Sequence, residues 1–176
     1  MKPMTMRSLS LGILALAAML STASAQKEPG KDILGKQAPD FTLPSVTGEK
    51  LRLSSLKGKI VVLDFWAVWC GPCTDSMPFF QKLQDTYRAQ GLEVVGLHVD
   101  DRMPPTDEVR AFLDELGIGY RNVASTTEVD DSYLVYAMPT TYILDRSGVV
   151  QKRHIGFNPK TAPGRIEGDV KALLSR

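Results

Sequence analysis

The order of strand-like and helix-like segments predicts an α/β fold, with one central sheet and helices on both of its faces. Two observations support this prediction. Strand and helix patterns alternate along most of the chain, and residues 60–65 form an apolar run that is interrupted only by Asp64. Such a run is typical of a strand buried on both faces at the centre of a sheet. The 176 residues, of which 43% are hydrophobic, are enough for one domain whose core needs no structural disulfides.

A β-hairpin is expected at the start of the folded part. Residues 41–43 and 51–53 each alternate apolar and polar side chains, and Thr47-Gly48 lies between them as a turn signal. Residues 54–56 are expected to form one short helical turn before the central strand.

The first long helix is expected to follow the central strand and to extend to about Ala89. Pro78 lies inside this stretch and is expected to kink it, and Gly91 is expected to end it. Its apolar side chains recur at helical spacing, namely Phe79, Phe80, Leu83 and Tyr87.

The remaining segments continue the alternation. In order, they are expected to be a buried strand at 92–99, a helix at 104–116, a short strand at 120–124, a helix at 129–136, strands at 140–144 and 149–155 around a turn at 145–148, and an amphipathic helix at 165–174. No internal repeat or second domain is evident.

The N-terminus has the pattern of a secretory signal peptide. Lys2 and Arg7 are followed by an apolar stretch from residue 9 to 20 and by the small residues 23–25. We therefore expect a signal peptide at 1–25, a flexible leader at 26–37 and a folded domain at 38–176. The location is then periplasmic or otherwise extracytoplasmic. The alternative is an uncleaved membrane anchor, because no charge lies between Arg7 and Lys27.

The charge balance argues against a nucleic-acid partner. The chain carries 21 basic and 20 acidic residues, and removing residues 1–25 takes away Lys2 and Arg7 and no acid. The mature net charge is then −1, without the basic footprint that nucleic acids or anionic membranes require. Membrane contact is expected only if the N-terminal segment stays uncleaved.

The two cysteines, Cys70 and Cys73, are separated by two residues and lie between a strand and a helix. A disulfide this short closes almost no loop, so it stabilises a fold little, and a redox pair explains it better. Cys70 would begin the helix, where unpaired N–H groups favour a thiolate, and Cys73 follows one turn later. Pro72 suits the first helical turn, and Gly71 leaves the approach open to a protein substrate.

Asp64 is the one polar residue of the central strand. Burial of a carboxylate without a partner is costly and raises its pKa, which suits a proton acceptor for Cys73. The alternative is a structural Asp held by backbone donors.

The segment 64–73, Asp-Phe-Trp-Ala-Val-Trp-Cys-Gly-Pro-Cys, closely resembles the active-site signature of thioredoxin. The chain from about Ala38 onward is similar to the TlpA/ResA branch of thioredoxin-like proteins. This similarity lies in residues 38–43, 51–58, Met77-Pro78 and 138–142, together with an inserted βα segment before residue 138. Ser76 stands where ResA-like proteins often carry a glutamate.

The resemblance implies a thioredoxin-like fold with a central mixed sheet, an N-terminal hairpin and a βα insertion. It implies that Cys70 is the exposed attacking cysteine, Cys73 the buried resolving one and Asp64 the proton-transfer carboxylate. It also implies that Pro139 is a cis-proline beside the disulfide. The residues implied to contact substrate are Trp66 and Trp69 as an aromatic wall, Gly71 and Pro72, and the backbone of Met138, which would pair with an extended segment.

The activity implied is that of a protein-disulfide reductase acting on exported proteins. The candidate substrates include the apocytochromes whose thiols are used in cytochrome c maturation. Electrons would come from a thiol donor in the membrane, and neither an organic cofactor nor a metal is required. Gly71-Pro72 matches the reducing end of the range of potentials known for such cysteine pairs.

Three other functions are possible from the same residues. Zinc or copper binding could use the cysteines with His98 and His154, but these histidines fall on separate predicted strands. A thiol peroxidase shares the pattern of residues 38–41, but Ala67 stands where that class needs a Thr. A non-enzymatic binding module would function without Cys70.

Overall fold

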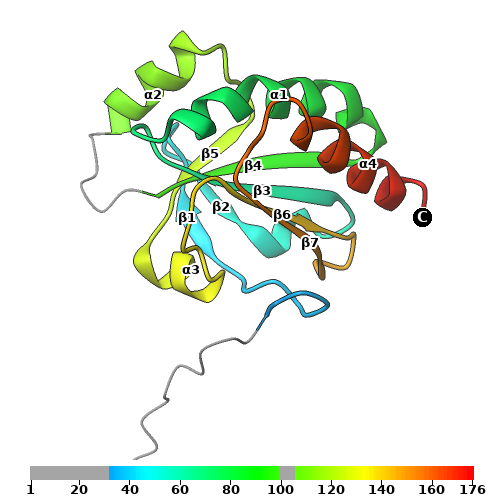
Figure 1. The fold of residues 1–176 in the computed structure, drawn as a ribbon. Coiled ribbons are helices and arrows are strands. Elements are labelled where there is room, and N and C mark those ends of the chain that lie inside the picture. Colours follow the sequence, from blue (N-terminus) through cyan, green and yellow to red (C-terminus); the bar gives the residue numbers. More distant parts are fainter. Residues whose placement is uncertain (1–31, 100–105) are drawn as a thin grey trace, which may run out of the picture. The chain divides into compact units, whose positions relative to one another are not determined.

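The computed structural model describes residues 32–99 and 106–176, and it confirms the predicted α/β class (Figure 1). Five strands form a mixed sheet in the order β5-β4-β3-β6-β7. Their bounds are Ile60–Trp66 for β3, Leu92–His98 for β4, Arg121–Ala124 for β5, Thr140–Leu144 for β6 and Val150–Ile155 for β7. The β3–β4 and β4–β5 pairs are parallel, whereas β3–β6 and β6–β7 are antiparallel.

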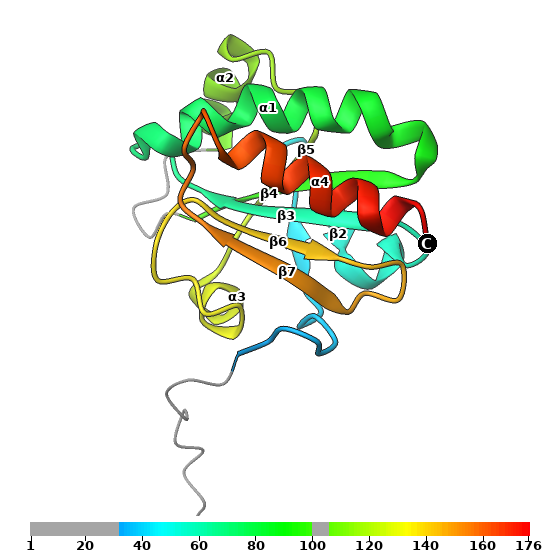
Figure 2. The same ribbon diagram turned by 45° about the vertical axis from the view of Figure 1, so that its right-hand side comes forward.

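Helices cover both faces of this sheet, as expected. Figures 1 and 2 show α1 (Gly71–Tyr87) and α4 (Ala162–Leu174) over one face, and α3 (Thr127–Ser132) on the other. The predicted hairpin is present as β1 (Thr42–Pro44) and β2 (Lys50–Arg52), in which Leu43 pairs with Leu51. Helix α2 (Thr106–Glu115) joins the α1 side of the core through Val109 and Leu113.

Strand β3 divides the core into two clusters because its side chains alternate between the faces. Ile60, Val62 and Trp66 belong to the cluster under α1 and α4. Val61, Leu63 and Phe65 belong to the cluster on the hairpin side. All seven residues of the strand are buried, which confirms the central position predicted from the apolar run. Asp64 lies two residues from both Val62 and Trp66, so its side chain is on the same face of the sheet as theirs, under α1.

Several element boundaries differ from the sequence prediction. The helix expected at 129–136 is α3 at Thr127–Ser132, because the Thr126 hydroxyl caps it by accepting from the Val129 N–H and because Leu134 has a positive φ of 55°. Helix α4 begins at Ala162, three residues earlier than expected, with a proline in its first turn. Gly91 adopts the left-handed conformation (φ 96°) after a short 3-10 turn, Arg88–Gln90, that follows α1.

The predicted signal peptide at 1–25 lies outside the described residues, as do residues 26–31 of the predicted leader and residues 100–105. The remaining part of the leader is held by hydrogen bonds. The Gly35 N–H donates to the Val150 carbonyl at 2.8 Å, and the Val150 N–H donates to the Lys36 carbonyl at 2.9 Å. The described part of the predicted leader is therefore hydrogen-bonded to β7.

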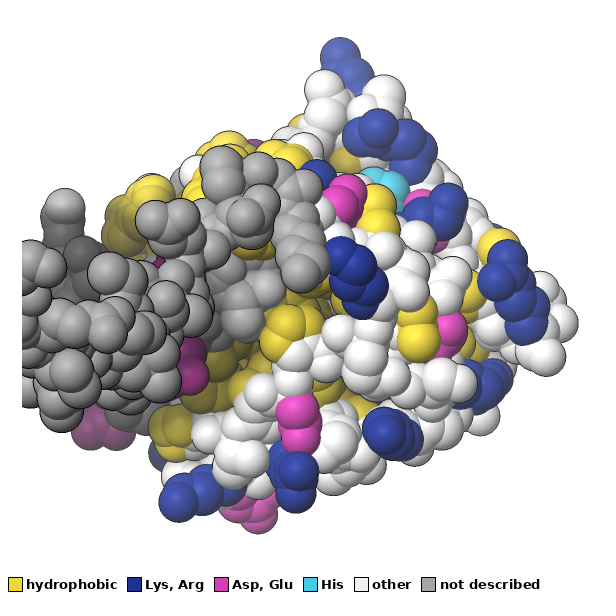
Figure 3. Space-filling model, turned by 90° about the horizontal axis from the view of Figure 1, so that it is seen from below, with side chains coloured by type: hydrophobic (Ala, Val, Ile, Leu, Met, Phe, Trp, Pro, Cys, Tyr) yellow, Lys and Arg dark blue, Asp and Glu magenta, His cyan; other side chains and the backbone are white. Residues whose placement is uncertain are grey.

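The surface seen from below (Figure 3) mixes charges of both signs. On the described part of this face, Lys and Arg side chains are interspersed with Asp and Glu rather than gathered into one patch. No helix within residues 32–99 and 106–176 has the length and apolar character needed to span a bilayer.

Candidate active site

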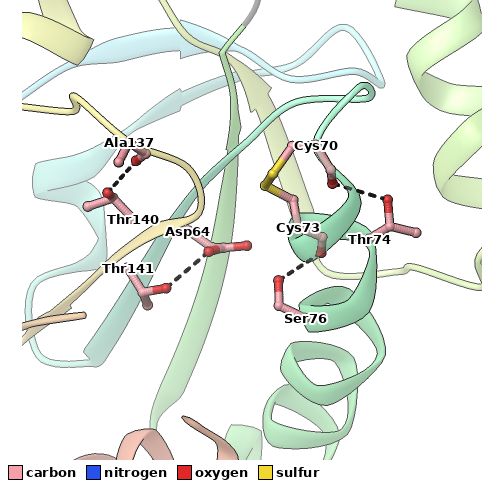
Figure 4. Close-up of a disulfide and its surroundings, with 8 residues drawn as sticks. All are labelled: Asp64, Cys70, Cys73, Thr74, Ser76, Ala137, Thr140 and Thr141. Carbon is pink, nitrogen blue, oxygen red and sulfur yellow. Dashed lines mark hydrogen bonds between the residues drawn. A yellow bond between two sulfur atoms is a disulfide. The ribbon is translucent and has the colours of Figure 1, made fainter. Parts of the chain in front are cut away.

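The two cysteines form a disulfide at the start of α1, with an S–S distance of 2.06 Å and a Cα–Cα distance of 5.2 Å. Cys70 is the N-cap residue, with extended backbone, and Cys73 lies in the first turn (Figure 4). The Cys73 and Thr74 N–H groups both donate to the Cys70 carbonyl. No side chain caps this helix, and its first turn contains no acid. The partial positive charge of the helix N-terminus therefore acts on Cys70 without a neutralising carboxylate.

The disulfide is more buried than the resemblance implied. Cys70 is 5% exposed and Cys73 is not exposed at all. Both belong to the apolar cluster that contains Ala67 and Met77. This packing explains why Cys70, which was expected to be exposed, is almost completely buried. Of the two cysteines, it is Cys70 that retains some accessible area.

Asp64 is completely buried, on the same face of the sheet as the disulfide. Burial raises the pKa of its carboxyl to about 7 from the ordinary 3.8, although a hydrogen bond from Thr141 acts in the opposite direction. The Thr141 hydroxyl donates to Oδ1 at 3.1 Å. Oδ2 has no hydrogen-bond partner among the described residues. The carboxyl is thus held by a side-chain hydroxyl, and it can exchange a proton near neutral pH.

Pro139 follows a cis peptide bond from Met138, as the resemblance implied. It directly precedes β6, whose residues Thr140 and Thr141 pair with Phe65 and Asp64 of the central strand. Met138 is partly buried against the cluster that contains the cysteines. The loop that carries the cis-proline therefore borders the apolar cluster to which the cysteines belong, and the strand that follows the loop pairs with the central strand.

The two tryptophans of the motif occupy different environments. Trp69 is 63% exposed, next to Cys70 in the sequence, and can contact a substrate. Trp66 is fully buried, and its Nε1–H donates to Asn122 Oδ1 at 2.9 Å. Its ring also stacks on Phe112 and meets the His98 ring at an angle. Trp66 thus fixes the strand end below the site from inside the core.

Sequence reasoning did not identify Thr141, Gly96 or Asn122, which form one row across the sheet with Asp64. Asp64 is the register partner of Thr141 on one side and of Gly96 on the other, and Gly96 is the partner of Asn122. A Cβ at Gly96 would lie 2.0 Å from Asn122 Oδ1 and 2.9 Å from Trp66 Nε1. A glycine inside a strand signals such a close approach, and it was the available clue in the sequence.

Ser76 is buried, and its hydroxyl donates to the Cys73 carbonyl at 2.7 Å (Figure 4). It therefore lies within the first turns of α1, where it adds no charge to the site. His98 and His154 lie on β4 and β7, and His154 Nε2 is 3.0 Å from Asp169 Oδ2. Within the described residues, no group of three or more His, Cys, Asp and Glu side chains is arranged to hold a metal ion.

Comparison with known proteins places these features in a family. The model of the AhpC/TSA family matches residues 34–153. "Thioredoxin-like protein YneN" of Bacillus subtilis is 43% identical over 126 residues, which are 72% of this chain and 74% of that protein. "Thiol-disulfide oxidoreductase ResA" of Bacillus anthracis is 32% identical over 142 residues, with 80% and 78% covered.

A solved structure shares the fold as well. The crystal structure of a "thiol:disulfide interchange protein, thioredoxin family protein" from Chlorobium tepidum superposes with a TM-score of 0.69 and 27% identity. The match covers 78% of this chain and 95% of that one. The mixed sheet, the helices on its faces and the N-terminal hairpin are thus those of a thioredoxin-like fold.

Proposed function

Since the chain belongs to the AhpC/TSA family and is a thioredoxin-like protein of the TlpA/ResA type, we propose that it is an exported thiol–disulfide oxidoreductase that reduces disulfides of other proteins. One observation carries the proposal. Cys70 and Cys73 form a disulfide at the uncapped N-terminus of α1. The names of the relatives, thiol-disulfide oxidoreductase and thiol:disulfide interchange protein, agree with it.

The reaction begins from the dithiol form. The Cys70 thiolate attacks one sulfur of a substrate disulfide, a mixed disulfide forms, and the other substrate sulfur leaves as a thiolate that takes up a proton. Cys73 then loses its proton and attacks Cys70, which closes the Cys70–Cys73 disulfide and releases the second substrate thiolate. Two electrons have passed to the substrate. A thiol donor restores the dithiol by the reverse exchange.

Asp64 is proposed to accept the proton of Cys73 during the second attack. Its burial on the disulfide side of the sheet supports this role, and so does a pKa raised to about 7. A carboxyl with the ordinary value of 3.8 would be a weak acceptor, because efficient proton transfer needs a pKa near the working pH.

Substrate is proposed to bind as an extended segment along the loop before β6. The backbone of Met138 would pair with it, as in strand addition. Three large apolar side chains are exposed on different segments: Trp69 at 63% directly before Cys70, Tyr136 at 77% in the loop before β6, and Ile155 at 60% at the end of β7. Ile155 is the register partner of Thr140, directly after the cis-proline. These side chains can contact the residues that flank a substrate disulfide.

The cellular setting follows from the N-terminal sequence. We propose that residues 1–25 export the chain as a signal peptide to the periplasm or an equivalent compartment, where a thiol donor in the membrane supplies electrons. An uncleaved segment would instead anchor the domain at that membrane. Cytochrome c maturation, through reduction of apocytochrome thiols, is the proposed pathway.

The test uses a Cys73→Ser variant, which keeps the attacking sulfur and lacks the resolving one. In an extracytoplasmic extract it should form mixed disulfides that reducing agent releases, whereas a Cys70→Ser control should form none. The wild-type protein should also catalyse insulin reduction with dithiothreitol. Equal yields of adducts on both variants would refute the proposal. Rapid consumption of hydrogen peroxide, without insulin reduction, would favour a peroxidase instead.

A further inference from the structure

The two carboxyl oxygens of Asp64 have different surroundings. Oδ1 accepts the hydroxyl of Thr141, which lies directly opposite on β6 and is itself buried. Oδ2 is equally buried and accepts no hydrogen bond from a described residue. Figure 4 shows Asp64 between β6 and α1, with one oxygen bonded to Thr141 and the other directed to the side where Cys73 and Ser76 lie.

This asymmetry determines which oxygen can carry a proton. A carboxylate accepts hydrogen bonds at both oxygens, but a protonated carboxyl accepts at one oxygen and donates from the other. When the proton is on Oδ2, Oδ1 is the carbonyl oxygen, and it can accept the hydroxyl of Thr141 in both states. Oδ2 is also the oxygen on the side of Cys73, so the exchanged proton is already on the correct side.

We propose that Thr141 is a positioning residue for proton transfer, whose hydroxyl holds Oδ1 of Asp64 so that Oδ2 takes the proton from Cys73 and returns it. The proposal rests on the proposed function. In the resolving step, the S–H bond of Cys73 breaks, an O–H bond forms at Oδ2, and the new thiolate attacks Cys70. When the disulfide is reduced again, the same oxygen gives the proton back to Cys73.

Other groups face Asp64 without taking the place of Thr141. Tyr120, which precedes β5, is buried; burial raises the pKa of its hydroxyl well above the ordinary value, and the charge of Asp64 raises it further. His98 lies two residues beyond Gly96, the partner of Asp64, on β4. The cysteines face it from α1. Helices α2 and α4 contribute apolar side chains to this cluster, among them Val109, Leu113, Ile166 and Val170.

Thr140 provides a matched control within the same strand. It is buried like Thr141, but its hydroxyl donates to the Ala137 carbonyl at 2.6 Å rather than to Asp64. A Thr→Val change at either position removes one buried hydroxyl at nearly constant volume. A difference between the two variants therefore reports the bond to Asp64 rather than a general weakening of β6.

The first measurement is the titration of the Asp64 carboxyl by carbon-13 NMR in the oxidised full-length protein, without any substrate. Loss of a donor to a charged acceptor should raise the pKa of Asp64 by about 1 to 2 in Thr141→Val. Thr141→Ser, which keeps the hydroxyl, should retain the wild-type value, and so should Thr140→Val. If the Val variant does not fold, Thr141→Ala serves in its place.

The second measurement is the rate at which a mixed disulfide on Cys70 is resolved, as a function of pH. A pKa raised by one leaves about one tenth of Asp64 ionised at pH 7 instead of about half, so Thr141→Val should resolve it about five-fold more slowly there and at the wild-type rate near pH 9. In an Asp64→Asn background the Thr141 change should have no further effect on the profile.

The outcomes separate this inference from the proposed function. A wild-type protein that reduces disulfides, combined with an unchanged Asp64 titration in Thr141→Val, would refute the role of Thr141 alone. An equal effect in Thr140→Val would do the same. A wild-type protein that reduces no disulfide would refute the function, whatever the titration shows.

Discussion

Replacing Asp64 with Asn makes the pH dependence of stability a direct measure of the buried carboxyl. The folded chain holds this group, fully buried, at a pKa of about 7 against the ordinary 3.8. Below about pH 4 the carboxyl is protonated in the folded and unfolded states alike, and it contributes nothing. Between pH 4 and pH 7 the unfolded chain releases the proton while the folded chain retains it. Stability must therefore fall as the pH rises.

The size of this fall follows from the difference between the two pKa values, at about 1.4 kcal/mol per pH unit. It amounts to about 4 kcal/mol at pH 8 and above. Asn cannot ionise. Between pH 4 and pH 8, the unfolding free energy of the Asp64→Asn variant should therefore rise by about 4 kcal/mol relative to that of the wild type. Any destabilisation caused by the amide itself is the same at each pH and does not alter this change. With a urea m-value of about 2 kcal/mol per molar, the midpoints should move relative to each other by about 2 M.

The assay is urea denaturation of both oxidised proteins at pH 4, 6 and 8, followed by circular dichroism. All other titrating groups are common to the two proteins and cancel in the comparison. Parallel curves, with a constant difference in unfolding free energy across this range, would show that the carboxyl ionises in the fold as it does in water. The proposed proton acceptor would then lose its physical basis.

Further predictions concern the core below the site. Gly96→Ala should lower the unfolding free energy by about 1 to 3 kcal/mol in urea titrations, because its Cβ would lie 2.0 Å from Asn122 Oδ1; a neutral result would mean that Asn122 moves freely. Trp66→Phe should lower the unfolding free energy by about 2 kcal/mol or more, because it leaves the buried Asn122 oxygen without its Nε1–H donor. An unchanged thermal unfolding temperature would contradict this prediction. Tyr133→Phe should cost about 1 kcal/mol and speed amide exchange near Pro39, whose carbonyl accepts the Tyr133 hydroxyl at 2.7 Å.

Local sequence patterns were sufficient to predict most helices and strands, and to identify Cys70 and Cys73 as a candidate redox pair. The apolar run at 60–65 predicted the central strand, because a strand covered on both faces has no position at which a polar side chain is favoured. The placement of Cys70 and Cys73 between this strand and a helix could likewise be predicted from a short stretch of sequence. Boundaries were less certain where a cap decides them, as Thr126 does for α3.

The tertiary structure alone decided what surrounds Asp64. The sequence marked this carboxyl as unusual, but its partner Thr141 is 77 positions away, and Asn122, which bonds Trp66, is 56 positions from it. Such pairs depend on the register between strands, and register is set by how the whole sheet packs against its helices rather than by any local preference. The proposed chemistry of the cysteines thus depends on a short segment, whereas the proposed control of their proton depends on the assembled sheet.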